Sequence, residues 1–531
     1  MTRSRSLAAA LLAATMLAVP AALSTPAGAA APASSAELVK VIASLDGELD
    51  AALGERLEAL GVVRGLELPT IDAVALTLPS AAVPLVAELP GVQAVVPQRR
   101  LQLQLYRSKE QIKALGVSAP DRYRSGTQTF DRPGVTGKGV TVGIIDSGIF
   151  AEHPGFGGRV VAGLNFEFSE LVDSGVVPAD QWDTYAESTG TSALQDEVGH
   201  GTHVAGTVGG SGAGAQTDRD LSGVAPDVSL VSLKIASAAN GVVEDVGFEE
   251  NALAAIDYLI RHRDLGVNLT NNSWGLLETE PSSVPGGEPT DFDAANAVVE
   301  AASAAGITMV FSAGNDGPEP GSINRDPGGA PSAITVAAAC KGTEQGQGGS
   351  CPAGEITGFS SRGAANGTGP QVDVSAPGDQ ILAPVSPVSV LTPLTECLDP
   401  GEPLYYCISG TSMAAPHVTG VVALMQQVKP DLSPAQAERC LETTADDLLT
   451  PGVDIHSGYG MVDTVEALRC THALTARTAL GAAPTVVAPP SAPDTAAPSG
   501  GSLPATGGGI VAGLLGAVAV GTALLLRRRR A

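Results

Sequence analysis

Strand-like and helical segments alternate along residues 137–338, and this alternation constrains the fold more than any other feature of the chain. The first segment, residues 137–146, is a near-continuous apolar run, as expected for a parallel strand buried on both faces. Later strand-like segments cover residues 160–165, 228–235, 267–273, 307–312 and 333–338, and helical segments cover 251–263 and 293–305. The pattern predicts an α/β fold with a doubly wound, mainly parallel sheet.

A smaller unit precedes this region. Residues 31–105 contain strand-like and helical segments in the order β-α-β-α-β, at 36–43, 50–60, 73–78, 82–89 and 92–96. A series of this size predicts a small α+β domain. The polar and basic segment 98–124 joins it to the larger region.

Both ends of the chain differ in composition from its middle. Residues 1–30 combine a basic start, an apolar run from Leu7 to Leu23 and small residues at 27–29, which predicts a signal peptide for secretion. A membrane anchor is the alternative, but Pro20 interrupts the short apolar run. Residues 476–502 are rich in Ala, Pro, Thr and Ser and predict an extended linker.

Charge and cysteine content narrow the function classes. The chain has 30 basic and 56 acidic residues, a net charge of −26, which argues against nucleic-acid binding and fits a secreted protein. Behind a secretory signal, the six cysteines favour disulfides, since no pair has metal-ligand spacing. Pairing between sequence neighbours is the hypothesis chosen among the connectivities that six cysteines allow: Cys340–Cys351, Cys397–Cys407 and Cys440–Cys470.

The stretch from Gly410 to Val418 contains a candidate nucleophile. Ser412 stands two residues after a glycine, in a run of small residues that can enter a helix. Pro416 suits such a helix only in its first turn, which would place Ser412 at the N-terminus, where backbone N–H groups favour negative charge. A buried helix of small residues with no catalytic role is the alternative on this stretch alone.

Two upstream motifs complete the constellation. Asp146 ends the first apolar strand, and His200 lies in a Gly-His-Gly-Thr-His-Val-Ala-Gly motif. Together with Ser412 they follow the chain order Asp, His, Ser. From about Gly137 to about Leu468 the chain resembles the subtilisin-like serine proteases, or subtilases, and this implies a catalytic domain over residues 125–470.

The resemblance implies a role for each residue. His200 would take the proton of the Ser412 hydroxyl, and Asp146 would hold the other ring nitrogen and stabilise the imidazolium. Asn315, just after a strand-like segment, matches the oxyanion-hole asparagine of the family, with the backbone N–H of Ser412 as second donor. This chemistry requires no cofactor.

Substrate-binding residues are also implied by the resemblance. They fall in two stretches, Ser273, Trp274 and Gly275, and Ser312, Ala313 and Gly314. The first stretch would pair with an extended peptide through backbone hydrogen bonds. For Trp274 itself, a pocket wall and a core residue are equally open interpretations. The loop 326–332 would close a pocket for an apolar residue.

Other polar residues are assigned to structure. Asp196 is predicted to cap the helix that carries His200, and His203, His417 and His153 are assigned to packing or loops. The acidic set of Glu244, Asp245, Glu249 and Glu250 would suit a dibasic substrate, but a solvated face is the favoured interpretation. Many subtilases bind calcium; a structural calcium ion stays open here with no ligand assigned, since no D-x-D-x-D-G loop is present.

In subtilases the position of residues 31–105 holds an inhibitory propeptide that is cut off. A permanent N-terminal domain is the alternative. If the segment is a propeptide, the cut is expected between Gln98 and Arg124.

The C-terminus resembles a cell-wall sorting signal over residues 503–531. Leu-Pro-Ala-Thr506-Gly507 precedes an apolar run at 510–526 and four terminal arginines. In that resemblance a sortase cuts between Thr506 and Gly507 and joins Thr506 to peptidoglycan on a Gram-positive-type surface. A plain membrane anchor is the alternative.

These expectations describe a monomeric, secreted, wall-anchored serine endopeptidase that processes its own zymogen and acts on polypeptides. A surface adhesion protein on an inactive protease scaffold is the competing class. A maturase dedicated to one exported protein would share the chemistry and differ in substrate range.

Overall fold

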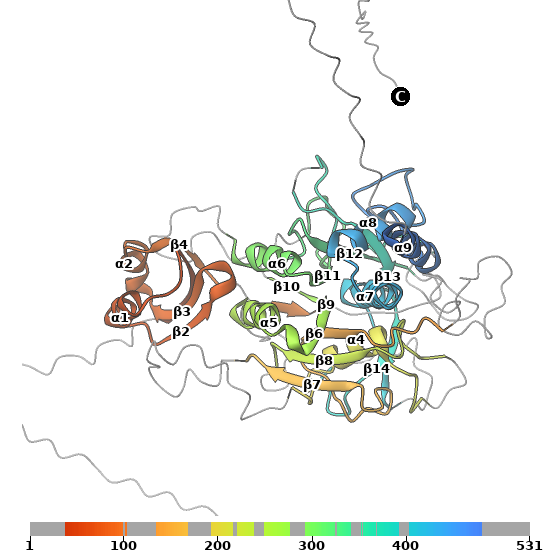
Figure 1. The fold of residues 1–531 in the computed structure, drawn as a ribbon, viewed down its shortest axis with the longest axis horizontal. Helices are drawn as coiled ribbons and strands as arrows, with labels where there is room; N and C mark the ends of the chain where they lie inside the picture. The colour runs from red at the N-terminus through yellow and green to blue at the C-terminus, as the bar shows by residue number, and fades with distance from the viewer. Residues whose placement is uncertain are drawn as a thin grey trace, which may run out of the picture. The chain divides into compact units, whose positions relative to one another are not determined.

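The computed structural model describes residues 38–98, 101–103, 134–167, 193–215, 220–237, 249–276, 293–323, 327–340, 352, 354–367, 369–391 and 403–479 (Figure 1). The chain divides into two units, residues 1–480 and 481–531, and every described residue belongs to the first. The predicted signal peptide and sorting signal, and nearly all of the predicted linker, lie outside the described residues.

The predicted parallel sheet is confirmed. Seven strands pair in parallel in the order β13-β12-β11-β9-β6-β8-β7 (Figure 1). Their bounds are β6 Thr141–Asp146, β7 Val160–Asn165, β8 Ser229–Lys234, β9 Val267–Asn272, β11 Thr308–Ser312, β12 Ala333–Ala339 and β13 Val374–Pro377. The first of these strands, β6, lies between β8 and β9, so the strand order reverses there. In open α/β sheets this reversal point is where a ligand crevice forms, at the carboxyl ends of the strands.

Helices cover both faces of the sheet. They are α4 His200–Gly209, α5 Glu249–Arg261, η5 Arg263–Leu265, α6 Ala294–Ala304, α7 Thr411–Val428, α8 Pro434–Thr444 and α9 Thr464–Ala479. One apolar core holds residues of α4, α7, α8 and α9, and the other holds residues of α5 and α6. Neighbouring residues of β6 enter different cores, Ile144 the first and Ile145 the second, which explains why residues 142–145 of this strand lack polar side chains.

Two helices, α8 and α9, are absent from the predicted elements. A start signal for α8 is nevertheless present in the sequence, because Ser433 and Gln436 form a capping box and Pro434 occupies the first turn. The disulfide Cys440–Cys470 joins the two helices, with 5.7 Å between the Cα atoms, and confirms that predicted pair. Cys340 and Cys407 are also disulfide-bonded, and their predicted partners lie outside the described residues.

The N-terminal domain is a four-stranded antiparallel sheet with two helices. Its elements are β1 Leu38–Leu45, α1 Ala51–Ala59, β2 Arg64–Leu68, η1 Pro69–Ile71, β3 Ala73–Pro79, η2 Ser80–Ala82, α2 Val83–Ala87 and β4 Val92–Pro97, with strand order β2-β3-β1-β4. The predicted series omits β2, a short edge strand whose glycine and two charged residues weaken the β pattern. Leu66 and Leu68 of β2 are buried.

The N-terminal domain packs against α5. Its apolar residues Ile42, Leu66 and Leu68 share one core with Leu253 and Ile256 of that helix. Two carboxylates of α5, those of Asp257 and Glu250, also bind polar groups of the N-terminal domain. Thr70 Oγ1 donates to Asp257 Oδ1 at 2.7 Å, and Glu250 accepts from Gln98 Nε2 at 3.1 Å and pairs with Lys40.

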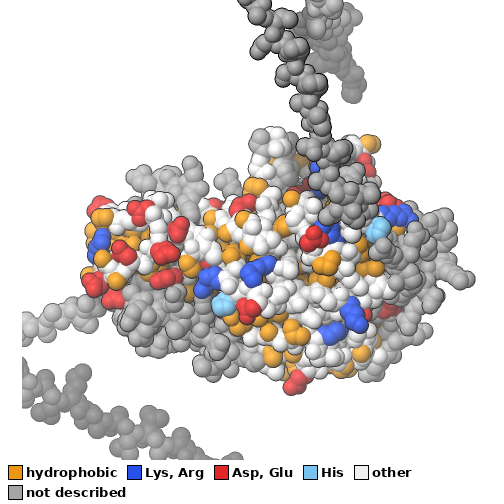
Figure 2. Space-filling view, in the orientation of Figure 1, with side chains coloured by type: hydrophobic (Ala, Val, Ile, Leu, Met, Phe, Trp, Pro, Cys, Tyr) orange, Lys and Arg blue, Asp and Glu red, His pale blue; other side chains and the backbone are white. Residues whose placement is uncertain are grey.

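The solvated-face interpretation of Glu249 and Glu250 is therefore wrong. The two residues are only 1% and 3% exposed, because they begin a helix that the N-terminal domain packs against, and Lys40 compensates the charge of Glu250. Glu244 and Asp245 lie outside the described residues. On the face drawn in Figure 2, acidic side chains gather over the N-terminal domain, in keeping with the net negative charge.

Two small antiparallel sheets complete the described fold. β5 Leu101–Leu103 pairs with β10 Trp274–Leu276, and β14 Ile381–Pro384 pairs with β15 Tyr405–Ile408. Among the described residues, no helix has both the length and the apolar composition needed to cross a membrane.

Candidate active site

The candidate site lies where the strand order of the sheet reverses. In the parallel pair β6–β9, Ile145 is opposite Asn272, so Asp146 and Ser273 follow at the carboxyl ends of neighbouring strands. Both residues are fully buried. Asp146 therefore stands at the edge where the fold predicts a crevice.

Asp146 and His200 are in direct contact. Asp146 Oδ1 lies 2.6 Å from His200 Nδ1 and also accepts the backbone N–H of Ser147 at 2.7 Å. The close approach requires glycine at position 201, where a Cβ atom would lie 2.1 Å from the carbonyl oxygen of Gly148. The carboxylate thus holds one ring nitrogen, and the other is the nitrogen that can exchange a proton with a substrate or nucleophile.

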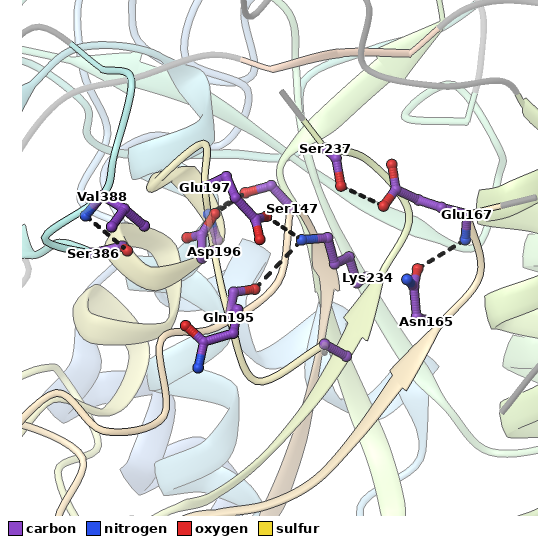
Figure 3. A network of polar contacts seen from close by, with 12 residues as sticks. Ser147, Asn165, Glu167, Gln195, Asp196, Glu197, Lys234, Ser237, Ser386 and Val388 are labelled. Atoms are coloured by element: carbon purple, nitrogen blue, oxygen red, sulfur yellow. Dashed lines mark hydrogen bonds and ion pairs between the residues drawn. The ribbon is translucent and has the colours of Figure 1, made fainter. Parts of the chain in front are cut away.

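Asp196 supports this contact indirectly, through bonds to the residue after Asp146 and to the first turn of α4. Figure 3 draws Asp196 and Ser147 in one polar network. The carboxylate of Asp196 accepts from Ser147 Oγ at 2.9 Å, from Gly199 N at 2.7 Å, and from Thr202 N and Oγ1 at 2.8 and 2.6 Å. Burial raises the pKa of Asp196, and the bonds from Thr202 and Gly199 oppose the rise. The predicted capping role is confirmed, because Asp196 accepts the backbone N–H of Thr202 in the first turn of α4. Asp196 also binds the hydroxyl of Ser147, the residue after Asp146.

Ser412 lies in the first turn of α7, as predicted, but the prediction for Pro416 is wrong. Pro416 stands inside the helix, beyond the first turn, and has no N–H to donate to the carbonyl of Ser412. The hydroxyl of Ser273 donates to that carbonyl instead, at 2.7 Å. In return, the hydroxyl of Ser412 donates to the carbonyl of Ser273 at 2.8 Å.

The helices α4 and α7 pack against each other and both begin at the same edge of the sheet. The first turn of α4 contacts the end of β6, and the first turn of α7 contacts Ser273 at the end of β9. Asp146, His200 and Ser412, far apart in the sequence, are thereby gathered at one edge.

Asn315 lies beside the start of α7. Its Oδ1 accepts from the backbone N–H of Thr411 at 3.1 Å and from the hydroxyl of Thr411 at 2.9 Å. Because these bonds fix the oxygen end of the amide, Nδ2 is the end that can donate to an oxyanion. The sequence interpretation missed Thr411; a hydroxyl next to the candidate nucleophile was the available signal.

The two predicted substrate-binding stretches are both largely buried, and in the first of them only Gly275 is half-buried. Trp274 is 1% exposed and packs edge-on against Phe311, so it is a core residue, and of the two open interpretations the pocket wall is not observed. A Cβ atom at Gly275 would meet nothing within 4 Å, and this residue pairs with Gln102 of β5. The strand β10 therefore accepts an extended antiparallel partner.

The second stretch follows β11. Ser312 and Ala313 are buried, and Gly314, at φ +100°, donates its N–H to Thr411 Oγ1 at 3.2 Å. Of the predicted pocket loop, residues 327–332 are described, and a Cβ atom at Gly328 would lie 3.3 Å from the carbonyl oxygen of Ser312. The loop thus lies against this stretch, and the preference for an apolar residue stays a prediction.

Comparison with known proteins decides the family. A model of the subtilase family matches residues 137–460. The chain belongs to the subtilase family. It is a subtilisin-like serine endopeptidase by class. The position of Asp146, His200 and Ser412 at one edge of the sheet agrees with this class.

Individual relatives are distant. The subtilase is 29% identical to the serine protease AprX of Bacillus subtilis over 64% of this chain and 69% of the relative. It is 32% identical to fervidolysin of Fervidobacterium pennivorans over 63% of this chain, but covers only 41% of that protein. The crystal structure of fervidolysin, described as a keratinolytic enzyme related to subtilisin, superposes with a TM-score of 0.58 at 25% identity, over 82% of this chain and 61% of that one.

Three histidines of the subtilase are structural, as predicted. Burial lowers the pKa of His203 to about 3, so the ring is neutral, and its Nε2 lies 3.1 Å from the carbonyl oxygens of both Ile381 and Tyr406. His417 Nδ1 contacts the carbonyl of Met413 at 2.6 Å. His153 packs against Phe156 and Tyr405, with Nε2 3.0 Å from the carbonyl of Leu404.

One acidic group of the subtilase has oxygen atoms close enough to share a cation. Ligand atoms of Asp373, Glu438 and Glu442 lie within 4.8 Å of one another. Burial, together with Glu438 and Glu442, raises the pKa of Asp373 to about 8, and burial with Glu442 and Glu300 raises that of Glu438 to about 7. Asp373 directly precedes β13, whereas Asp146 ends β6, so in this parallel sheet the two residues lie at opposite edges. The raised pKa values make the stability of the folded state depend on pH.

The change Glu438→Gln is expected to stabilise the subtilase at alkaline pH. Between about pH 4 and pH 8 the folded state keeps protons on this group that the unfolded state has released, so stability falls as pH rises. After discounting for partial exposure of Glu438, we expect a gain of about 1 kcal/mol at pH 9 and a smaller one at pH 5. Thermal unfolding at both pH values measures it, with the exposed Glu319→Gln as control. An equal gain at both values would contradict the expectation.

Proposed function

We propose that this subtilase is a secreted serine endopeptidase whose triad is Asp146, His200 and Ser412. The observation that carries the proposal is the 2.6 Å contact between Asp146 Oδ1 and His200 Nδ1, at the edge where α7 brings Ser412. Family membership supports the chemistry, and sequence alone supports secretion. No cofactor is part of the reaction, and a structural calcium ion is outside the proposal.

In the proposed reaction, the hydroxyl of Ser412 turns from the carbonyl of Ser273 to Nε2 of His200, the ring nitrogen that does not contact Asp146. His200 takes the proton while the oxygen attacks the peptide carbonyl, and Asp146 stabilises the imidazolium. Asn315 Nδ2 and the N–H of Ser412 donate to the oxyanion. His200 then protonates the leaving amine, and an acyl-enzyme remains. A water molecule attacks the acyl group while His200 takes its proton, and His200 then returns that proton to Ser412 Oγ as the acid product leaves.

The N-terminal domain is proposed to be an inhibitory propeptide. Support comes from β5, which occupies the strand partner position on β10 where an extended substrate would pair. In this register Leu103 is opposite Trp274, and Ser273, whose carbonyl contacts the Ser412 hydroxyl, is one step further. The proposal places the processed bond directly after Gln104, which lies outside the described residues. A permanent domain that blocks the cleft is the alternative.

Residues 31–502, secreted as wild type and as Ser412→Ala, test activity and processing together. We expect the wild type alone to lose its N-terminal domain, with Leu105 as the new N-terminus, to be labelled by a fluorophosphonate and to hydrolyse casein. Folded wild type that is neither labelled nor active would favour an inactive binding scaffold. Labelling and processing without casein cleavage would indicate a dedicated maturase. Labelling with an intact N-terminus would indicate a permanent domain.

Attachment to the cell wall is proposed from residues 503–531. The partners would be a sortase, which cuts between Thr506 and Gly507, and peptidoglycan. The extended linker would then hold a monomeric enzyme away from the wall. A Thr506→Ala chain that still appeared in the covalently bound wall fraction of a sortase-bearing host would contradict this.

A further inference from the structure

We infer that Ser273 is a positioning residue for the nucleophile, in addition to its predicted place in the substrate-binding strand. The inference rests on the proposed function, because it concerns the reactivity of Ser412. Ser273 and Ser412 are separated by 139 residues, both are fully buried, and each hydroxyl donates to the carbonyl of the other, at 2.7 and 2.8 Å. The start of α7 is thereby joined to the end of β9.

Pro416 explains why this pair exists. In an α-helix the carbonyl of Ser412 would accept the N–H of the residue four positions later. That residue is Pro416, which has no N–H, so a buried carbonyl in the first turn of α7 loses its helical partner. A buried acceptor left unpaired is costly, and the Ser273 hydroxyl removes that cost.

A buried polar chain aims the Ser273 hydroxyl at this carbonyl. Asn271 Nδ2 donates to Ser273 Oγ at 2.8 Å, and Thr419 Oγ1 donates to Asn271 Oδ1 at 2.9 Å. Asn271 binds a lone pair of Ser273 Oγ, and the single hydrogen of that hydroxyl is donated to the carbonyl of Ser412. The chain begins and ends on α7, at Thr419 and at Ser412, and it passes through the end of β9. It holds the nucleophile against the strand next to the one that ends at Asp146.

A double-mutant cycle in the full chain tests the inference, with Ser273→Ala, Pro416→Ala and the double variant. Removing the Ser273 hydroxyl is expected to lower kcat and the fluorophosphonate labelling rate by roughly ten-fold or more, with little change in KM. In Pro416→Ala the new N–H can bond to the Ser412 carbonyl, so the same removal is expected to cost less than about three-fold. The labelling probe carries no peptide, which separates positioning from substrate pairing.

Thr471→Val is the matched control, because Thr471 is buried and its hydroxyl also donates to a helix carbonyl, that of Ala467 at 2.8 Å. We expect it to lower the Tm and leave kcat unchanged. Losses in kcat that add in the double variant, or a rise in KM alone for Ser273→Ala, would overturn the inference. Labelling of the wild type would still support the proposed function in either case. If Ser273→Ala fails to fold, recovery of folding by the added Pro416→Ala supports the inference, and no recovery overturns it. Unlabelled wild type would refute the proposed function itself.

Discussion

Replacing Asp146 with Asn is expected to lower kcat about 10⁴-fold and leave KM nearly unchanged. Asp146 Oδ1 contacts both His200 Nδ1 and the N–H of Ser147, and Oδ2 is buried without a hydrogen-bond partner among the described residues. An amide that keeps its oxygen at the first position buries an unpaired NH₂ at the second, and an amide turned the other way opposes the N–H of Ser147. In either orientation the negative charge that stabilises the imidazolium is lost.

The variant chain needs to be matured in trans by tagged wild-type enzyme, which is then removed, before peptide hydrolysis and fluorophosphonate labelling are measured. Asp431→Asn is the control, because it makes the same chemical change in a surface carboxylate, 77% exposed, that pairs with Lys429. The control is expected to match the wild type in kcat. A loss of less than about ten-fold for Asp146→Asn would mean that His200 does not depend on this carboxylate.

The sheet could be predicted from the sequence because its signal is local. Several strands buried on both faces are short, mainly apolar runs, such as residues 142–145 and 333–339, and α5 and α6 show their own helical period. The order of Asp146, His200 and Ser412 is equally visible, although only the fold brings them to one edge. Their catalytic roles stay predictions.

What could not be predicted depends on contacts between distant segments. Glu250 looks like a surface residue until Lys40, 210 positions earlier, is seen beside it. Pro416 looks like a helix breaker beyond the first turn until Ser273 supplies the missing donor. In the first case a buried charge is compensated, and in the second a missing N–H group. Each partner lies far away in the sequence, so no local pattern identifies it.

Asn315→Leu is expected to lower kcat by about 10²–10³-fold, because it removes one oxyanion donor. It also removes the acceptor for Thr411, so a second variant is needed to separate the two effects. Thr411→Val deletes the hydroxyl that contacts Asn315 Oδ1 and the N–H of Gly314, but it leaves Nδ2 of Asn315 in place. If donation to the oxyanion dominates, Thr411→Val is expected to lose less than about ten-fold.

Inhibitor affinities distinguish the two roles further. A peptide boronate forms a tetrahedral adduct on Ser412 and should lose affinity in Asn315→Leu by about the same factor as kcat, whereas a product peptide should bind as in the wild type. Equal losses in kcat for both variants would instead show that Asn315 acts by holding the start of α7. The nucleophile would then be positioned from two sides, by Ser273 at its carbonyl and by Asn315 through Thr411, with the backbone N–H of Ser412 as the main oxyanion donor.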